Sequence, residues 1–173
     1  MKNTDKSTGA IKSIEYGHHE VHDGKMYQVM YSVPSIGALT TTDDTMQITW
    51  TTPNGPALMH MTIDAYCGAS ALFLFTEAPT GGDLTASGTL VSYNKYRGRA
   101  NHSVVFSYDG TEVSGGTVLE TEYISAGKFG AGESRSAQEW ILRSNTKYAV
   151  SLLLNDTQPA TLALEYYMHA DRR

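Results

Sequence analysis

Short runs in which apolar and polar residues alternate occupy most of this chain, and they constrain its fold more than any other feature. Met46, Ile48 and Trp50 alternate with polar residues, and the same period of two recurs around Met61 and Leu164. Since successive side chains of a strand point to opposite faces, each run predicts a strand with one buried face. About eight or nine such runs with no long helical run between them predict an all-β fold, a jelly-roll-like antiparallel β-sandwich.

One short helical turn is expected near residues 137–144. Ser136 and Glu139 have the spacing of a capping box, in which each side chain pairs with the other residue's backbone at the start of a helix. Asn145 predicts the end of the turn, because asparagine tolerates a left-handed conformation. Alternation then resumes, so the turn leads into a core strand whose inward residues are Tyr148, Val150, Leu152 and Leu154.

An early β-hairpin is predicted between Tyr16 and Val33. Two alternating runs flank the dipeptide Asp23-Gly24. A two-residue Asp-Gly connection favours the type I′ turn that joins adjacent antiparallel strands.

The chain divides into a polar N-terminal segment and one domain. Residues 1–14 contain almost nothing to bury, which predicts a flexible N-terminal arm carrying Lys2 and Lys6. Residues 15–173 are expected to form the β-sandwich domain, which is long enough for its own core.

Charge, apolar run length and cysteine content argue against several classes of partner and site. The 173 residues carry a formal net charge of -5, which argues against nucleic acid as a partner. No apolar run is long enough to span a membrane, so no membrane association is expected. Cys67 is the only cysteine, which rules out an intrachain disulfide and a cysteine-based metal cluster. His60 and Asp64 share a predicted strand face, but no nucleophilic serine accompanies them, and we expect no catalytic residues and no cofactor.

The segment from His18 to His22 is the most specific candidate for metal chemistry. On a strand, His18, Glu20 and His22 would project to one face, and two imidazoles with a carboxylate can bind zinc or iron. A polar strand face at a subunit interface explains the same residues. Our primary expectation is that the chain has no metal site.

A basic loop is expected between Asn94 and Asn101. Lys95, Arg97 and Arg99 lie within five residues, next to Tyr93 and Tyr96. Because the rest of the chain is acidic, this island of positive charge favours an acidic docking surface. A solvated loop without a partner is the alternative.

Five stretches of the sequence resemble a known family. They are His18 with His22 to Lys25 and Tyr27, Asn94 to Arg97, Glu139 to Leu142, Asn145 to Tyr148, and the closing Tyr166 to His169. Together they resemble the tailed-bacteriophage head decoration (capsid cement) proteins, although Met168 stands where an acidic residue is common in that pattern.

This resemblance implies a β-sandwich, commonly trimeric, that binds the major capsid protein. It places the protein on the capsid surface of the virion after synthesis in the host cytoplasm. Capsid or subunit contacts are expected from the arm and from two loops, at Lys2, Lys6, Lys95, Tyr96, Arg97, Arg99, Lys128 and Phe129.

Two other functions stay open. A carbohydrate- or host-surface-binding sandwich of a phage tail or capsid would use some of the 11 tyrosines as stacking platforms for sugars. A cupin-like metal-dependent enzyme would use the histidine cluster.

Overall fold

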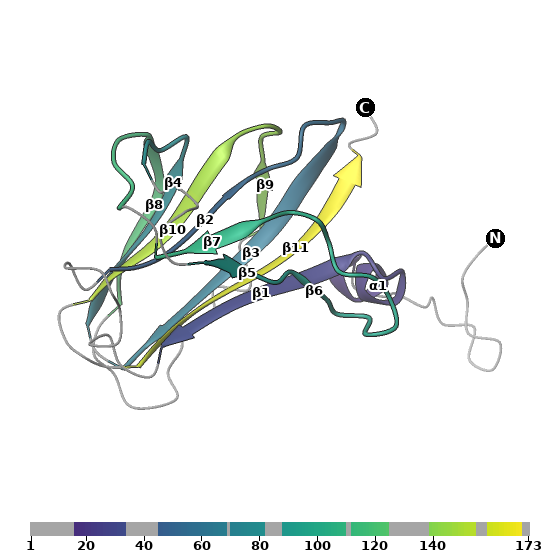
Figure 1. The fold of residues 1–173 in the computed structure, drawn as a ribbon, viewed down its shortest axis with the longest axis horizontal. Helices are drawn as coiled ribbons and strands as arrows, with labels where there is room; N and C mark the ends of the chain where they lie inside the picture. Colours follow the sequence, from purple (N-terminus) through teal and green to yellow (C-terminus); the bar gives the residue numbers. More distant parts are fainter. Residues whose placement is uncertain are drawn as a thin grey trace, which may run out of the picture.

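The computed structural model describes residues 16–33, 45–68, 70–81, 88–109, 112–124, 139–154 and 159–170. Within these ranges the chain forms one short helix and eleven strands (Figure 1). In chain order they are α1 (Tyr16–His22), β1 (Met26–Val33), β2 (Thr45–Thr51), β3 (Ala57–Cys67), β4 (Ala71–Glu77), β5 (Thr89–Leu90), β6 (Tyr93–Asn94), β7 (Phe106–Tyr108), β8 (Thr117–Ile124), β9 (Trp140–Leu142), β10 (Lys147–Leu154) and β11 (Ala160–Ala170). The described part of the chain has no helix of the length and apolarity that a membrane span requires. The predicted arm, residues 1–14, lies outside the described residues.

The strands pair into two antiparallel sheets. One has five strands in the order β6-β1-β11-β3-β9, and the other has six in the order β5-β7-β2-β10-β4-β8. Eight of these strands form the four-stranded layers β1-β11-β3-β9 and β2-β10-β4-β8, with β1 to β4 alternating between the layers. This nested order is that of a jelly roll, so the predicted fold class is confirmed.

The core lies between the two sheets and follows the predicted alternation. Met46, Ile48 and Trp50 of β2 are at most 1% exposed, and all three belong to the hydrophobic cluster that both sheets share. Trp50 stacks on Tyr148 of β10, with ring centroids 5.9 Å apart. From the other sheet, Tyr166 of β11 is fully buried. Burial of this size gives the sandwich its stability, since each large apolar side chain contributes about 1.5–3 kcal/mol.

The first predicted hairpin is wrong, because residues 16–22 form α1 instead of a strand. Asp23-Gly24 ends this helix: the Lys25 N–H donates to Glu20 O at 2.9 Å, and the Gly24 N–H donates to Val21 O at 3.0 Å. These two bonds define a Schellman motif, which needs a left-handed residue after the helix. Gly24 supplies it with a φ of 72°. The Asp-Gly dipeptide therefore turns the chain as expected, but out of a helix.

The helical turn predicted near residues 137–144 is also wrong where the structure describes it. Trp140–Leu142 form β9, whose Trp140 pairs with Met61 of β3. Residues 137 and 138 lie outside the described ranges. Asn145 does adopt the expected left-handed conformation, with a φ of 49°, at the corner between β9 and β10. The corner is held by Thr52, whose hydroxyl donates to Arg143 O at 2.6 Å and accepts from the Thr146 N–H at 3.0 Å.

Candidate functional site

The structure brings four of the predicted contact residues together. Lys95, Tyr96, Arg97 and Arg99 belong to the loop of residues 93–101, which begins with β6 at the edge of the five-stranded sheet. We call this segment the edge loop. The other predicted contact residues lie outside the described part of the chain: Lys2, Lys6, Lys128 and Phe129.

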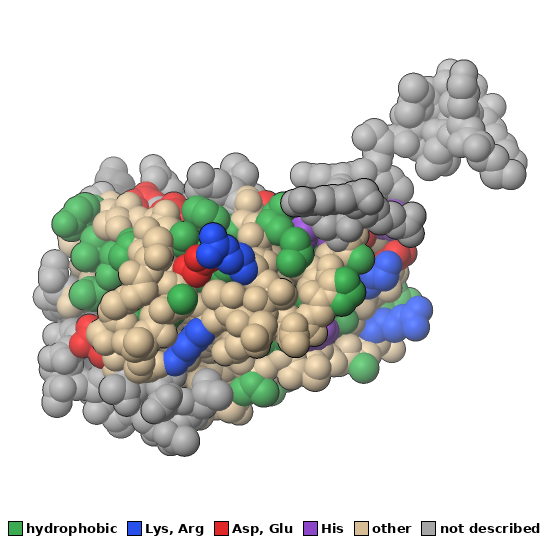
Figure 2. Space-filling view, turned by 90° about the horizontal axis from the view of Figure 1, so that it is seen from above, with side chains coloured by type: hydrophobic (Ala, Val, Ile, Leu, Met, Phe, Trp, Pro, Cys, Tyr) green, Lys and Arg blue, Asp and Glu red, His purple; other side chains and the backbone are tan. Residues whose placement is uncertain are grey.

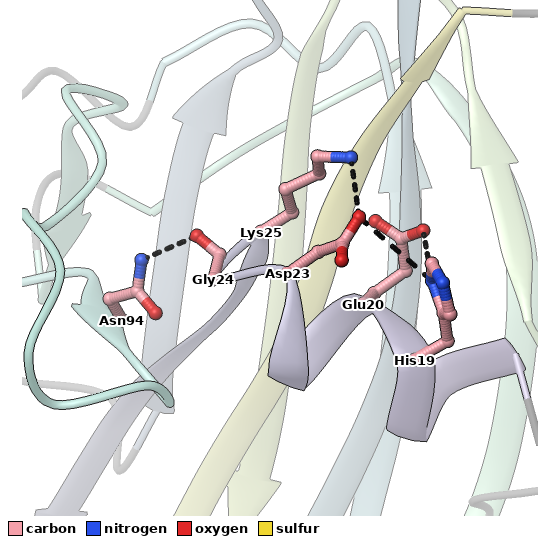
Figure 3. A network of polar contacts seen from close by, with 6 residues as sticks. All are labelled: His19, Glu20, Asp23, Gly24, Lys25 and Asn94. Atoms are coloured by element: carbon pink, nitrogen blue, oxygen red, sulfur yellow. Dashed lines mark hydrogen bonds and ion pairs between the residues drawn. The ribbon is translucent and has the colours of Figure 1, made fainter.

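Asn94 fixes the conformation of the edge loop. Its side chain is buried, and its Nδ2 donates to Gly24 O at 2.7 Å and to Ala100 O at 3.1 Å. Its Oδ1 accepts from the Tyr96 N–H at 2.9 Å. Figure 3 shows the amide pointing at the Gly24 carbonyl in the turn that follows α1. The edge loop is therefore a defined structure tied to the α1–β1 turn, about 70 residues away in sequence.

Two arginines of the edge loop lie on tyrosine rings. The Arg97 guanidinium is 5.2 Å from the centroid of the Tyr93 ring, and the Arg99 guanidinium is 5.9 Å from that of Tyr96. The aliphatic part of Arg99 also packs on Gly24, where an added Cβ would lie 2.7 Å from Arg99 Cγ. Because aromatic faces attract cations, these contacts restrict where the guanidinium groups can lie.

The charges of the edge loop are only partly neutralised. Lys95 Nζ lies 2.8 Å from Glu165 Oε1, which compensates one cation. Among the described residues, no carboxylate lies within ion-pair distance of Arg97 or Arg99. Figure 2 shows Lys and Arg side chains, with hydrophobic side chains between them, at the end of the molecule that carries α1 and β6 in Figure 1. The loop thus presents two uncompensated guanidinium groups.

The adjoining α1–β1 turn has its own ion pair. Lys25 Nζ donates to Asp23 Oδ2 at 2.9 Å, and this hydrogen bond lowers the pKa of Asp23 below its ordinary value. Asp23 is therefore ionised at neutral pH and forms an ion pair with Lys25 (Figure 3).

An open hollow adjoins the edge loop on the outer face of the five-stranded sheet. It has a volume of about 440 Å³ and is lined by Gln28, Tyr93, Asn94, Lys95 and Arg97. Tyr93 pairs with Gln28 across β6 and β1, so both side chains project from the same face. Tyr93 remains 50% exposed. The hollow combines an aromatic ring, an amide and a guanidinium, the groups that bind carboxylates or sugars.

The sequence does not show that Gln28 lines the hollow or that Asn94 fixes the edge loop. Gln28 is one polar residue in an alternating strand, and only the pairing of β6 with β1 places it in the hollow. The Asn94 amide acts on Gly24 and Ala100, and no local pattern shows the first of these contacts.

The strand geometry on which the metal hypothesis rested is wrong. His18, Glu20 and His22 belong to α1, and residues two apart on a helix lie about 200° apart around its axis. Glu20 is accordingly buried and His22 exposed; the side chain of His18 lies outside the description. Within the described ranges, no group of three or more His, Cys, Asp or Glu side chains is arranged to hold a metal ion.

A second polar cluster lies on the outer face of the same sheet. The Tyr167 hydroxyl of β11 donates to Glu139 Oε1 at 2.7 Å, and His60 Nδ1 of β3 lies 3.4 Å from Glu139 Oε2. The His60 and Tyr167 rings stack with centroids 4.8 Å apart. These contacts hold the residue before β9 against β3 and β11, so we assign this cluster a structural role.

Comparison with protein-family models finds no match, and neither the curated proteins nor the solved structures contain a match to the chain.

Proposed function

We propose that this protein is a structural component of a bacteriophage virion, which binds the outside of the capsid shell and reinforces it as a decoration (cement) protein. The observation that carries the proposal is a jelly-roll sandwich with a firmly held, exposed loop of arginines and tyrosines at one sheet edge. The proposal also rests on the family resemblance of the sequence, and it assigns the chain no catalytic role.

A rigid body with an exposed contact loop suits attachment to a shell. Folding has already fixed the Asn94 amide and the Arg97 and Arg99 stems, so little conformational entropy is lost when a partner binds. Each contact can be weak, because many copies bind a symmetric shell together. In this proposal the partner is the major capsid protein, the chain acts as a homotrimer on the capsid surface, and nucleic acid has no part.

Particle reconstitution tests the proposal. Purified protein is mixed with shells from a phage that lacks its gene, the particles are separated by sedimentation, and occupancy is measured by gel densitometry and electron cryo-microscopy. We expect saturable binding at symmetry-related positions on the shell exterior, and a free protein with three times the 18.9 kDa mass of one chain. Protein that stays in the supernatant at every concentration contradicts the proposal.

Carbohydrate binding is a second candidate, and the hollow is the observation that favours it. Tyr93 is half-exposed beside the Gln28 amide, which is the combination of stacking surface and hydrogen-bonding group that sugars use. A glycan array is the direct test. Reproducible signals that disappear in Tyr93→Ala would favour this function over attachment to the shell.

A further inference from the structure

We infer that the edge loop binds an acidic, extended peptide segment, in which carboxylates meet Arg97 and Arg99 and an apolar side chain lies in the hollow beside Tyr93. The inference rests on the proposed function only in naming the source of the segment, which is the shell protein.

The charge of the loop selects the class of ligand. Arg97 and Arg99 have no carboxylate partner in the described part of the chain, while Lys95 is already paired with Glu165 at 2.8 Å. A guanidinium presents a planar array of donors that matches a carboxylate in two parallel hydrogen bonds. An acidic side chain therefore fits this position better than a neutral one.

The surroundings of the arginines favour a peptide over a simple anion. Tyr93 is 50% exposed and Tyr96 is 45% exposed, and their rings lie against the Arg97 and Arg99 guanidinium groups, so apolar surface adjoins both cations. Met30, 53% exposed, lies two residues beyond Gln28 on the outward-facing side of β1. Free phosphate or acetate would leave this surface in water, whereas an apolar residue between two acidic ones would cover it.

Side chains of the edge loop, rather than backbone hydrogen bonds, are expected to bind the peptide. β6 pairs with β1 through only two residues, so it offers a short edge for strand addition. Nucleic acid is the less favoured polyanion, because the net charge of -5 repels a long phosphate backbone. The expected ligand is thus a short acidic and apolar segment of a protein.

Peptide titration of the ¹⁵N-labelled full chain tests the binding directly. The probe is the capped pentapeptide Gly-Asp-Leu-Asp-Gly, and its control has Asn in place of both Asp residues. We expect amide shift changes concentrated at residues 93–101 and Gln28. Arg97→Gln should bind the probe roughly fivefold more weakly, the factor that corresponds to about 1 kcal/mol for an exposed ion pair. Arg143→Gln, which removes an exposed arginine outside the loop, is the matched control and should bind as the wild type does.

Several results would overturn the inference. The first is equal binding of the Asn peptide, and the second is a set of shift changes that spares both the edge loop and Gln28. The third is equal weakening by Arg97→Gln and Arg143→Gln, and the fourth is tighter binding of a single-stranded oligonucleotide than of the probe. Tyr93→Leu should weaken binding and Tyr93→Phe should preserve it, because the phenylalanine ring still supports Arg97. Equal affinities of these two variants for the probe would also contradict the inference.

A particle experiment separates this inference from the proposed function. If the wild type fails to coat shells, the proposed function fails, whatever the peptide result. If the wild type coats shells and the double variant Arg97→Gln/Arg99→Gln coats them equally at low and high salt, the inference fails and the proposed function stands. The expected result is normal coating by the wild type, with occupancy by the double variant reduced by more than about tenfold at subsaturating protein.

Discussion

Removal of the Asn94 side chain should release the edge loop from the sandwich. Asn94→Ala deletes three hydrogen bonds, at 2.7, 3.1 and 2.9 Å, and leaves the carbonyls of Gly24 and Ala100 and the N–H of Tyr96 without this partner. At about 1 kcal/mol for each bond, the cost is about 3 kcal/mol. For a chain of this size this corresponds to a decrease of about 6–12 °C in Tm if the loop unfolds with the rest of the sandwich.

Hydrogen exchange distinguishes local from global loosening in this variant. If the loop opens alone, amides between residues 94 and 101 should exchange about a hundredfold faster, since each 1.4 kcal/mol is a factor of ten. Asn101→Ala is the matched control, because it removes one bond, from the Asn94 N–H to Asn101 Oδ1 at 3.1 Å, and should cost about 1 kcal/mol or less. If Asn94→Ala loses no more stability than Asn101→Ala and exchanges no faster, the amide does not organise the loop.

Two further predictions concern residues near the loop and at the β9–β10 corner. Burial lowers the pKa of His102 below its ordinary 6.5, and its Nδ1 accepts the Val104 N–H at 3.2 Å, so the ring of the folded protein is neutral at neutral pH. Just below pH 6.5 the unfolded chain therefore binds more protons than the folded chain. The stability contributed by the neutral ring should be complete above pH 6.5 and should decrease as the pH is lowered further. The Tm difference between about pH 7.5 and about pH 5 should therefore be smaller in His102→Asn, and an equal difference in both proteins would refute this. Thr52→Val should cost about 2 kcal/mol in chemical unfolding because it strips Arg143 O and the Thr146 N–H of a hydroxyl partner, whereas Thr52→Ser should retain most of the stability.

The sandwich could be predicted from the sequence because its strands have the simple period of two. Leu162 and Leu164 of β11 face the core as their alternation requires, and they pair with Ala65 and Ile63 of β3. No competing local signal acts on these residues. The edge strands are harder to predict, since β5 and β6 have only two residues each and leave no period to detect.

The errors arose where one local signal is compatible with two structures. Asp23-Gly24 serves a hairpin and a helix end equally well, because both need a residue with positive φ. The alternation from His18 to His22 favoured a strand. The segment is nevertheless a helix, in which Glu20 is buried and accepts the Schellman hydrogen bond from the Lys25 N–H. The Ser136–Glu139 spacing misled in a similar way, because Glu139 accepts from the Tyr167 hydroxyl of β11 and precedes strand β9.

The candidate site was predictable in its charge but not in its geometry. The cluster of Lys95, Arg97 and Arg99 is evident from their spacing. Pairing of Lys95 with Glu165, and packing of Arg99 on Gly24, depend on residues about 70 positions away in the chain. Such contacts follow from sheet pairing, so local sequence reasoning could not distinguish the lysine that pairs with Glu165 from the two arginines that have no carboxylate partner among the described residues.

The stretches that carry the family resemblance make contacts that hold the fold together. Gly24 accepts a hydrogen bond from Asn94, which joins the first stretch to the second, and Glu139 accepts one from Tyr167, which joins the third to the last. Each pair connects segments that are distant in sequence and adjacent in the jelly roll. Because these residues are used for folding, their presence in the sequence does not by itself identify a ligand. The proposal of a partner therefore depends on the side chains that the fold leaves exposed, above all Arg97. The reconstitution and peptide experiments test it.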